Sequence, residues 1–332
     1  MLDLGKIRFK KLKWGIAGLG RFSENSIIPI LGTVRKARIM SVYSSTPERS
    51  KFIAEKYTIQ NAYSNFDEFL TSDINAIYIG SANCDHYEQV IKAAKAKKHI
   101  LCDKPLALNS QQAAEMVQVC KDNKVQLAVN YVYRFHPLAQ KVKELLTNKT
   151  IGNIVSIDAH FHINFPPDGN FRFTKSKSGG GAMRDLGTHM IDLFRYFGGE
   201  LHPVSCIMDN VVFKGEVEDF ATGVLRFETG GYASFSVSTN AERAFNRIEI
   251  IGSDGSICLE NLVGPKFQSA KMTILLEKEA KKAFRKRANK LQRGLKLITN
   301  SFIKNQRAIA TGEDGLINMQ LMEELEKLAG KK

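Results

Sequence analysis

The sequence of 332 residues is 43% hydrophobic and 25% charged, as in ordinary soluble globular proteins, and its length suits two domains with separate cores. It contains no apolar run near the roughly 18 residues of a membrane span, and its short basic N-terminus lacks the apolar stretch of a secretory signal. The five cysteines lie singly, without the spacing of a zinc site or a disulfide framework, so we expect a cytoplasmic protein without a metal ion.

The first predicted element is a strand over residues 13–18, which leads into a glycine turn and then a helix. The turn reads Gly18-Leu19-Gly20-Arg21-Phe22-Ser23, and the helical stretch carries Ile27, Ile28, Ile30 and Leu31. This order places backbone N–H groups and a helix N-terminus where a pyrophosphate could rest. Ser23 replaces the third glycine of the dinucleotide fingerprint and is small enough for close helix–strand packing. The pattern therefore predicts a dinucleotide-binding domain.

The end of the next predicted strand, residues 37–43, indicates which dinucleotide binds. An NAD site usually has an acid here, which accepts from the ribose 2′-hydroxyl. This chain has Ser44-Ser45-Thr46-Pro47-Glu48-Arg49, whose hydroxyls and guanidinium suit a 2′-phosphate. The alternative is that Arg49 is a solvated charge in the first turn of the helix that begins near Pro47. We favour NADP over NAD.

Strand and helix patterns then alternate as far as residue 129. Strands are expected at residues 76–79, 99–102 and 125–129, and helices at 85–97 and 110–123. Such repeats predict a parallel, doubly wound Rossmann sheet, which we place in a domain of residues 1–130. The strand at 99–102 ends in Asp103-Lys104-Pro105, and Pro105 could adopt a cis bond. Ligands bind beyond the carboxyl ends of such strands, so Lys104 either points to the cofactor crevice or is a surface lysine.

From residue 131 the pattern is that of a second domain, residues 131–332. The aromatic segment Tyr131-Val132-Tyr133-Arg134-Phe135-His136-Pro137 leads into a helix up to about residue 148, and it either lines a pocket or packs in the core. Hairpin patterns later pair residues 224–227 with 232–237 and residues 247–251 with 256–259. Alternation of apolar residues with serine over 233–238 indicates a strand with one packed face. We predict an α+β domain with a mainly antiparallel sheet.

Three glycines, Gly179-Gly180-Gly181, precede a predicted helix in this second domain. Its apolar stripe holds Leu186, Met190 and Leu193. Asp185 and His189 are four residues apart, so they share a helical face. An imidazole whose pKa is near neutrality, one turn from a carboxylate, is a workable proton donor or acceptor. The alternative is an ordinary surface pair of charges.

Most of the net charge of +14 lies in residues 266–307, where thirteen Lys and Arg face two acids, a net charge of +11. Residues 277–307 are predicted to form one long helix with a basic outer face. We expect that face to be solvated; the alternatives are contact with a sugar nucleotide, an acidic partner or a membrane surface, and nucleic acid is not favoured. After a break at residues 312–315 a final helix is expected at 316–328, and the C-terminal helices could pack back on the first domain.

Together these features resemble the Gfo/Idh/MocA oxidoreductases, the family named after glucose–fructose oxidoreductase, inositol dehydrogenase and a rhizopine catabolism protein. The resemblance rests on the Gly18-Leu19-Gly20 turn, on Asp103-Lys104-Pro105 in place of the family's Glu-Lys-Pro, on the Tyr133-Arg134-Phe135-His136-Pro137 run, and on the segment from the three glycines through Asp185 and His189. It extends from about Leu12 over nearly all of the chain and is weakest around residues 278–296.

The resemblance implies a catalytic group of Lys104, Asp185 and His189. Lys104 and His189 would stand at the reacting hydroxyl or carbonyl, and Asp185 would hold a substrate hydroxyl or orient the group. The resemblance and the strand–turn pattern together assign to the cofactor site Gly18, Leu19, Gly20, Arg21, Phe22, Ser44, Ser45, Arg49, Ser81, Asn83, His86, Asp103, Lys104, Asn130 and Arg172.

We therefore expect an enzyme: an NADP-dependent oxidoreductase that transfers a hydride between nicotinamide and a secondary alcohol or ketone of a sugar, cyclitol or sugar derivative. The alternatives are an NAD-dependent nucleotide-sugar dehydrogenase and a non-catalytic regulator that binds a dinucleotide. We also expect a homo-oligomer, a dimer or tetramer, because few helices are predicted to cover the outer face of the antiparallel sheet, and such a face often pairs subunits in this family.

Overall fold

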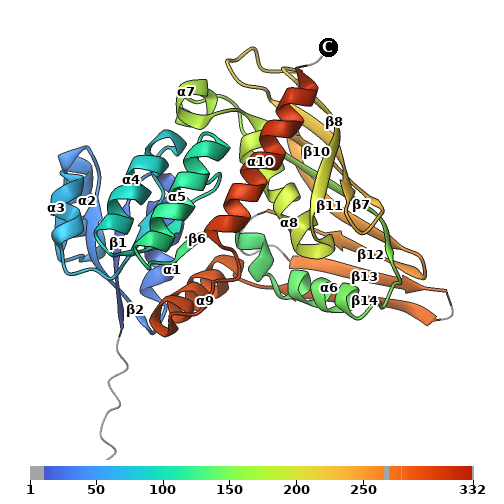
Figure 1. The fold of residues 1–332 in the computed structure, drawn as a ribbon, viewed down its shortest axis with the longest axis horizontal. Coiled ribbons are helices and arrows are strands. Elements are labelled where there is room, and N and C mark those ends of the chain that lie inside the picture. Colours follow the sequence, from blue (N-terminus) through green and yellow to red (C-terminus); the bar gives the residue numbers. More distant parts are fainter. Residues whose placement is uncertain (1–10, 265–268, 278, 331–332) are drawn as a thin grey trace, which may run out of the picture.

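A computed structural model describes residues 11–264, 269–277 and 279–330 (Figure 1). The predicted fold class is confirmed: a six-stranded parallel sheet is followed by an eight-stranded, mainly antiparallel sheet. Part of the basic segment, including Lys266 and Lys278, lies outside the described residues. Among the helices of the described chain, none is long and apolar enough to cross a membrane.

The first sheet has the strand order β3-β2-β1-β4-β5-β6, with all neighbours parallel. Its strands are β1 (Leu12–Ala17), β2 (Ala37–Tyr43), β3 (Asn61–Tyr63), β4 (Ala76–Ile79), β5 (His99–Cys102) and β6 (Leu127–Val129). Its helices are α1 (Ile28–Gly32), α2 (Pro47–Tyr57), α3 (Phe66–Thr71), α4 (Asn83–Lys95) and α5 (Ser110–Asp122), and a π-helical turn at Ser23–Ile27 precedes α1. The order reverses between β1 and β4, which is the switch point where such sheets bind ligands.

Burial explains why these strands form. Trp14 and Ile16 on β1 are fully buried, as are Ile27 and Leu31 on the following helical stretch. Strands covered on both faces by helices carry nearly continuous apolar runs. The short elements β3 and α3 were not predicted; α3 begins at a local signal, because the Asn65 side chain accepts from the Asp67 and Glu68 N–H groups.

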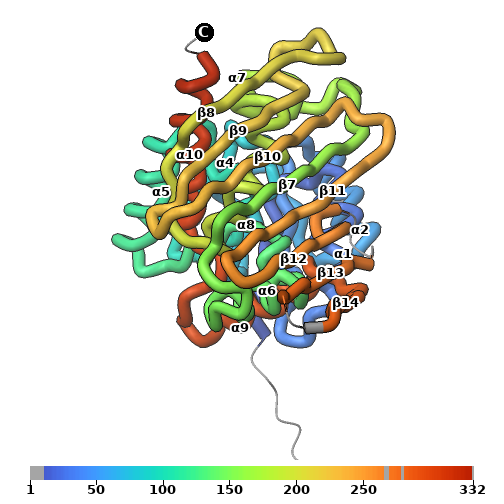
Figure 2. Tube along the Cα trace, turned by 90° about the vertical axis from the view of Figure 1, so that its right-hand side faces the viewer, coloured from blue at the N-terminus to red at the C-terminus, as the bar shows by residue number. Residues whose placement is uncertain are grey.

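The second sheet has the order β14-β13-β12-β11-β7-β10-β9-β8. Its strands are β7 (Ile154–Asn164), β8 (Leu201–Asp209), β9 (Phe220–Phe227), β10 (Tyr232–Ser238), β11 (Asn240–Gly252), β12 (Gly255–Glu260), β13 (Ser269–Leu276) and β14 (Glu279–Arg287). Both predicted hairpins are present, as β9–β10 and β11–β12, and only β10 and β7 pair in parallel among these strands. Viewed as in Figure 2, the strands lie in front of the helices.

The helices of this half lie mainly between the two sheets (Figure 1). They are α6 (Pro137–Thr147), α7 (Lys175–Ser178), α8 (Thr188–Gly198), α9 (Lys290–Lys304) and α10 (Gly312–Ala329), with short 3₁₀ turns at Val132–Phe135 and Phe171–Phe173 and a π-helical turn at Met183–Gly187. The C-terminal helices contact the first sheet: α10 packs between α5 and β8, and α9 packs against α1 and β1.

The long helix predicted over residues 277–307 is wrong. The structure has β14 and then α9, with the Asn289 side chain capping the new helix by accepting from the Gln292 N–H. β14 pairs antiparallel with β13 and places Phe284 opposite Met272. The helical stripe holds only in α9, where Leu291, Leu295 and Ile298 are buried. Pairing with a neighbouring strand is a tertiary contact that overrides local helix propensity.

The predicted break at residues 312–315 is also wrong, because α10 begins at Gly312. Thr311 and Asp314 form a capping box at its start. The two glycines serve packing: a Cβ on Gly312 would lie 2.7 Å from Leu127 Cδ2, and one on Gly315 would lie 2.8 Å from Leu106 Cδ2. They allow α10 to approach the first sheet closely.

A buried network of charges joins the segment after β6 to α8 and α10. The Arg134 guanidinium donates to both carboxylate oxygens of Asp192, at 2.7–3.1 Å, and to Asp314 Oδ2 at 3.1 Å. Asn318 Nδ2 also donates to Asp192, at 3.1 Å, and Arg195 contacts Asp314 and Asn318. The network holds the helix that carries His189 against the C-terminal helix.

Candidate active site

The glycine turn after β1 lies beside a cavity of about 320 Å³ at the carboxyl ends of the strands. Gly18 has φ +83°, and a Cβ there would lie 2.2 Å from the Ser81 backbone nitrogen. Only glycine fits this close approach. The cavity is lined by Gly18, Tyr43, Ser44, Ser45, Phe66, Ser81, Ala82, Asp85, Glu88 and Gln89. A cradle without a Cβ beside a polar cavity fits the ribose end of a dinucleotide.

Arg49 lies at this turn, but its guanidinium already has partners. It donates to the Leu19 carbonyl oxygen at 2.8 and 3.0 Å and pairs with Glu24. Lys56 also pairs with Glu24, at 2.7 Å, and hydrogen bonds from these two cations lower the pKa of the Glu24 carboxyl. The structure therefore brings Arg49 next to the predicted cofactor residues, with its charge shared with an acid that the sequence did not reveal as a partner.

Of the other residues of the turn, Arg21 contacts the second half of the chain. Phe22 is 39% exposed, and Arg21 Nη1 lies 3.0 Å from Asp168 Oδ2 in the segment after β7. This ion pair is exposed at Arg21, so it contributes little to stability. It nonetheless brings the glycine turn into contact with the segment after β7.

Asp103 organises the turn that follows β5. Its carboxylate accepts from the Tyr78 hydroxyl at 3.1 Å, from Asn130 Nδ2 at 3.3 Å and from the Lys104 N–H at 3.0 Å. The Lys104–Pro105 bond is cis, as the sequence suggested. Asp103 and Asn130 are thus brought together, and both orient the backbone that carries Lys104.

Lys104 reaches across to the π-helical turn before α8 and binds Asp185. Its Nζ lies 2.6 Å from Asp185 Oδ1 and 2.7 Å from the Asp185 carbonyl oxygen. Arg172 Nε adds a longer contact of 3.4 Å to the same Oδ1. Burial alone would raise the pKa of the Asp185 carboxyl, but the charges of Lys104 and Arg172 outweigh burial and hold its pKa well below the usual range. This group is therefore a carboxylate between two cations.

His189 lies beside this ion pair, in the first turn of α8. It is 7% exposed, and its ring contacts Tyr133 with centroids 4.7 Å apart and Tyr131 at 6.4 Å. Burial lowers the pKa of His189 well below its ordinary value, and the charge of Lys104 adds to that shift. This direction disagrees with the titration near neutrality that the sequence suggested, because desolvation favours the neutral form of an imidazole.

Asn83 and His86, in the first turn of α4, are both buried. His86 is fully buried, with Nδ1 3.1 Å from the Pro105 carbonyl oxygen, and Asn83 Nδ2 donates to the Ser178 carbonyl oxygen at 2.8 Å. These contacts stabilise the turn around Lys104 and the segment before the three glycines. Direct contact of either side chain with a cofactor stays a prediction.

Sequence reasoning missed Glu218, which fixes the glycine segment. Its carboxylate accepts from the Gly181 and Met183 N–H groups, both at 3.0 Å. A Cβ on Gly181 would lie 1.9 Å from the Glu218 carbonyl oxygen. No local pattern could reveal this partner, because it is some 35 residues from Met183. Within the described part of the chain, no three His, Cys, Asp or Glu side chains gather to hold a metal ion.

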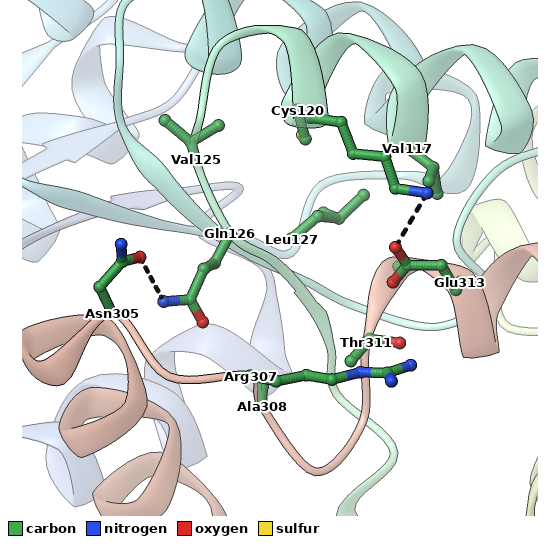
Figure 3. A pocket seen from close by; sticks show the side chains of 12 residues that line it. Val117, Cys120, Val125, Gln126, Leu127, Asn305, Arg307, Ala308, Thr311 and Glu313 are labelled. Carbon is green, nitrogen blue, oxygen red and sulfur yellow. Dashed lines mark hydrogen bonds and ion pairs between the residues drawn. The ribbon is translucent and has the colours of Figure 1, made fainter.

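A second cavity, of about 410 Å³, lies at the other end of the first sheet (Figure 3). Gln126, which lines it, precedes β6, so this cavity is near the amino ends of the parallel strands. An ion pair between Lys121 and Glu313, 3.2 Å long, connects α5 with α10 there. None of the predicted site residues lines this cavity, so the candidate active site is the cleft at the carboxyl ends.

The Rossmann order of the first sheet, the glycine cradle, and a lysine, aspartate and histidine between the two sheets define a dinucleotide-dependent oxidoreductase. Residues 12–131 match the model of the oxidoreductase family with an NAD-binding Rossmann fold, and residues 139–258 match the GFO/IDH/MocA C-terminal domain. The chain belongs to the Gfo/Idh/MocA family and is an NAD(P)-dependent oxidoreductase.

Named relatives act on sugars and cyclitols. The chain is 30% identical over 262 residues to myo-inositol 2-dehydrogenase of Thermotoga maritima. The aligned region covers 76% of each of the two chains. Its fold is similar to that of levoglucosan dehydrogenase solved with NADH and levoglucosan, with a TM-score of 0.87, 20% identity and coverage of 97% and 98%. It is also similar to a 3-ketoreductase from Actinomadura kijaniata solved with NADP and TDP-benzene, with a TM-score of 0.86, 21% identity and coverage of 96% and 98%.

Proposed function

We propose that this protein is an NADP-dependent oxidoreductase of a sugar, cyclitol or sugar derivative, with Lys104, Asp185 and His189 as its catalytic group. The observation that carries the proposal is that these three side chains meet at the carboxyl end of β5. The glycine cradle follows β1, so it lies at the same edge of the parallel sheet. When bound, the nicotinamide exchanges the hydride at its C4.

The roles follow from the protonation states. The ammonium of Lys104 would donate a hydrogen bond to the substrate oxygen and stabilise negative charge that develops there. The neutral imidazole of His189 would take the hydroxyl proton during oxidation and return it during reduction. Asp185, already bound to Lys104, would orient that ammonium and accept from a neighbouring substrate hydroxyl.

Replacing Lys104 or His189 tests this assignment. We expect Lys104→Ala and His189→Ala to lower turnover by roughly 10²–10⁴-fold, which is the usual contribution of a positioned acid or base. Dinucleotide binding, measured by fluorescence titration, should stay within a few-fold of the unchanged protein. Normal turnover in both variants would contradict the assignment, and loss of binding in both would indicate misfolding instead.

The preference for NADP rests on Ser44 and Ser45, which line the cavity beside the glycine turn, and on Arg49, which donates to the Leu19 carbonyl oxygen of that turn. Arg49 would have to share its guanidinium between Glu24 and a 2′-phosphate. We expect NADPH to bind more tightly than NADH, and Arg49→Ala to weaken NADPH binding by roughly tenfold, about 1.4 kcal/mol, while leaving NADH binding unchanged. Arg38→Ala, an exposed arginine on β2, is the matched control. Tighter binding of NADH would instead support the NAD-dependent nucleotide-sugar dehydrogenase.

A non-catalytic regulator that binds a dinucleotide is the competing function. The presence of the Lys104–Asp185 pair speaks against it, because burying these charges has a desolvation cost that a regulator need not bear. Screening polyols with NADP⁺ and NAD⁺ separates the two: binding of both dinucleotides without reduction by any sugar or cyclitol would favour the regulator.

We also propose a cytoplasmic homo-oligomer, a dimer or tetramer, paired through the outer face of the second sheet. Exposed apolar side chains on its strands support this: Val155, Val204, Ile207, Tyr232 and Leu275. A monomer in light scattering would contradict it.

The exposed cations of β14 are proposed to face solvent, and binding to anionic vesicles would favour the membrane-surface alternative.

A further inference from the structure

Lys290 is a buried lysine outside the proposed catalytic group. It is the first residue of α9 and is only 6% exposed. Its Nζ donates to the Gly264 carbonyl oxygen at 2.7 Å and to the Leu262 carbonyl oxygen at 3.3 Å. The same ammonium lies over the ring of Tyr133, 4.8 Å from its centroid. A cation over an aromatic face is attracted by the ring quadrupole, most strongly where water is excluded.

Tyr133 connects this lysine to His189. Its ring meets the imidazole with centroids 4.7 Å apart and an angle of 69° between the planes. Phe161 on β7 packs against the same ring at 6.3 Å. A chain of contacts therefore runs from Lys290 at the start of α9 through Tyr133 to the imidazole. Lys290 belongs to residues 266–307, whose sequence showed only an excess of positive charge.

The groups around His189 come from five parts of the chain. Lys104 follows β5, Asp185 lies in the π-helical turn before α8 with Arg172 next to it, Tyr131 and Tyr133 follow β6, and Lys290 begins α9. Lys104 and Asp185 form an ion pair, so their fields on the imidazole largely oppose each other. The carbonyl oxygens of Leu262 and Gly264 both accept from Lys290 and orient its ammonium.

Electrostatics agree with this geometry. Burial lowers the pKa of His189, the charges of Lys104 and Lys290 lower it further, and Asp185 opposes them. Burial also lowers the pKa of Lys290 to about 8, so its ammonium form predominates at neutral pH.

We infer that Lys290 is a positioning residue of this site: it holds Tyr133 against His189 and places a fixed positive charge behind the imidazole. The inference rests on the proposed function of His189 as the proton acceptor. The inference gives one residue of the basic segment, Lys290 at the start of α9, a role inside the protein. The cations of β14 in the same segment are exposed.

The test compares Lys290→Met, which removes the charge but keeps much of the side-chain volume, with Lys290→Arg, which keeps the charge. Lys296→Met, an exposed lysine on the same helix, is the matched control. The first readout is the NMR titration of the His189 ring protons in cofactor-free protein, assigned with His189→Gln. We expect His189 to titrate on the order of one pH unit higher in Lys290→Met and to stay in place in the other two variants.

The second readout is turnover. The acidic limb of the kcat profile should move upward with the imidazole, while KM for the dinucleotide should stay constant. Equal titration in Lys290→Met and the unchanged protein, including an imidazole that remains neutral in both, would overturn the inference. A shifted titration in a protein that oxidises no sugar or cyclitol would contradict the proposed function alone, so the two failures can be told apart.

Discussion

The buried pair of Arg134 and Asp192 gives a prediction whose magnitude follows from the structure. Their side chains are 5% and 2% exposed, and five hydrogen bonds leave the guanidinium, three of them to Asp192. In Arg134→Met, Asp192 keeps Asn318 as a donor but loses its counter-charge. Removing one partner of a buried pair costs about 3–5 kcal/mol, so we expect that loss of unfolding free energy.

Urea unfolding at pH 7 measures this cost, with Arg226→Met, an exposed arginine on β9, as the control that should change the free energy by less than about 0.5 kcal/mol. The double variant Arg134→Met/Asp192→Leu removes both charges. It should lose less than the sum of the single variants, by roughly 1–3 kcal/mol, because the Asp192 carboxylate is no longer left buried without its counter-charge.

The pH dependence gives a further check on the same reasoning. Burial raises the pKa of the Asp192 carboxyl, and Arg134 opposes that rise. Without Arg134 the folded carboxyl should take up a proton, so the deficit of Arg134→Met should shrink as the pH falls from 8 to 5. A cost below about 1 kcal/mol, strict additivity in the double variant, or a deficit that grows on acidification would refute the argument.

Three other predictions concern the site. Gly18→Ala should weaken NADPH binding by at least roughly tenfold, since its Cβ would lie 2.2 Å from the Ser81 nitrogen; fluorescence titration with unchanged affinity would contradict the cradle. Gly181→Ala should lower the melting temperature, because its Cβ would lie 1.9 Å from the Glu218 carbonyl oxygen, and an unchanged melting curve would count against this packing. The pKa of Asp185 is lowered in the folded protein, so its carboxylate contributes stability above its unfolded pKa, and this stability is lost on acidification. Below about pH 4, Asp185→Asn should therefore lose unfolding free energy less steeply than the unchanged protein. Parallel plots of unfolding free energy against pH for the two proteins would show that the carboxylate is not stabilised.

Several features of this protein are determined locally, and the sequence predicted them. The parallel strands carry continuous apolar runs, and the hairpins at residues 228–231 and 252–255 have glycine-rich turns, so both sheets could be inferred. Glycines that allow a close backbone approach, and a lysine at the end of a parallel strand, are local signals from which a site at the carboxyl ends of the strands could be predicted. These signals depend on neighbours within a few positions along the chain.

Other features depend on partners far along the chain, and only the tertiary structure decided them. Residues 279–287 form a strand because β13 pairs with them, although their apolar spacing also suited a helix. Arg49 is bound by Glu24, and His189 is desolvated by Tyr131 and Tyr133, so neither the sharing of that guanidinium nor the lowered pKa of the imidazole could be seen locally. Burial and charge neighbours set protonation states, and both arise only when the two sheets and α9 come together.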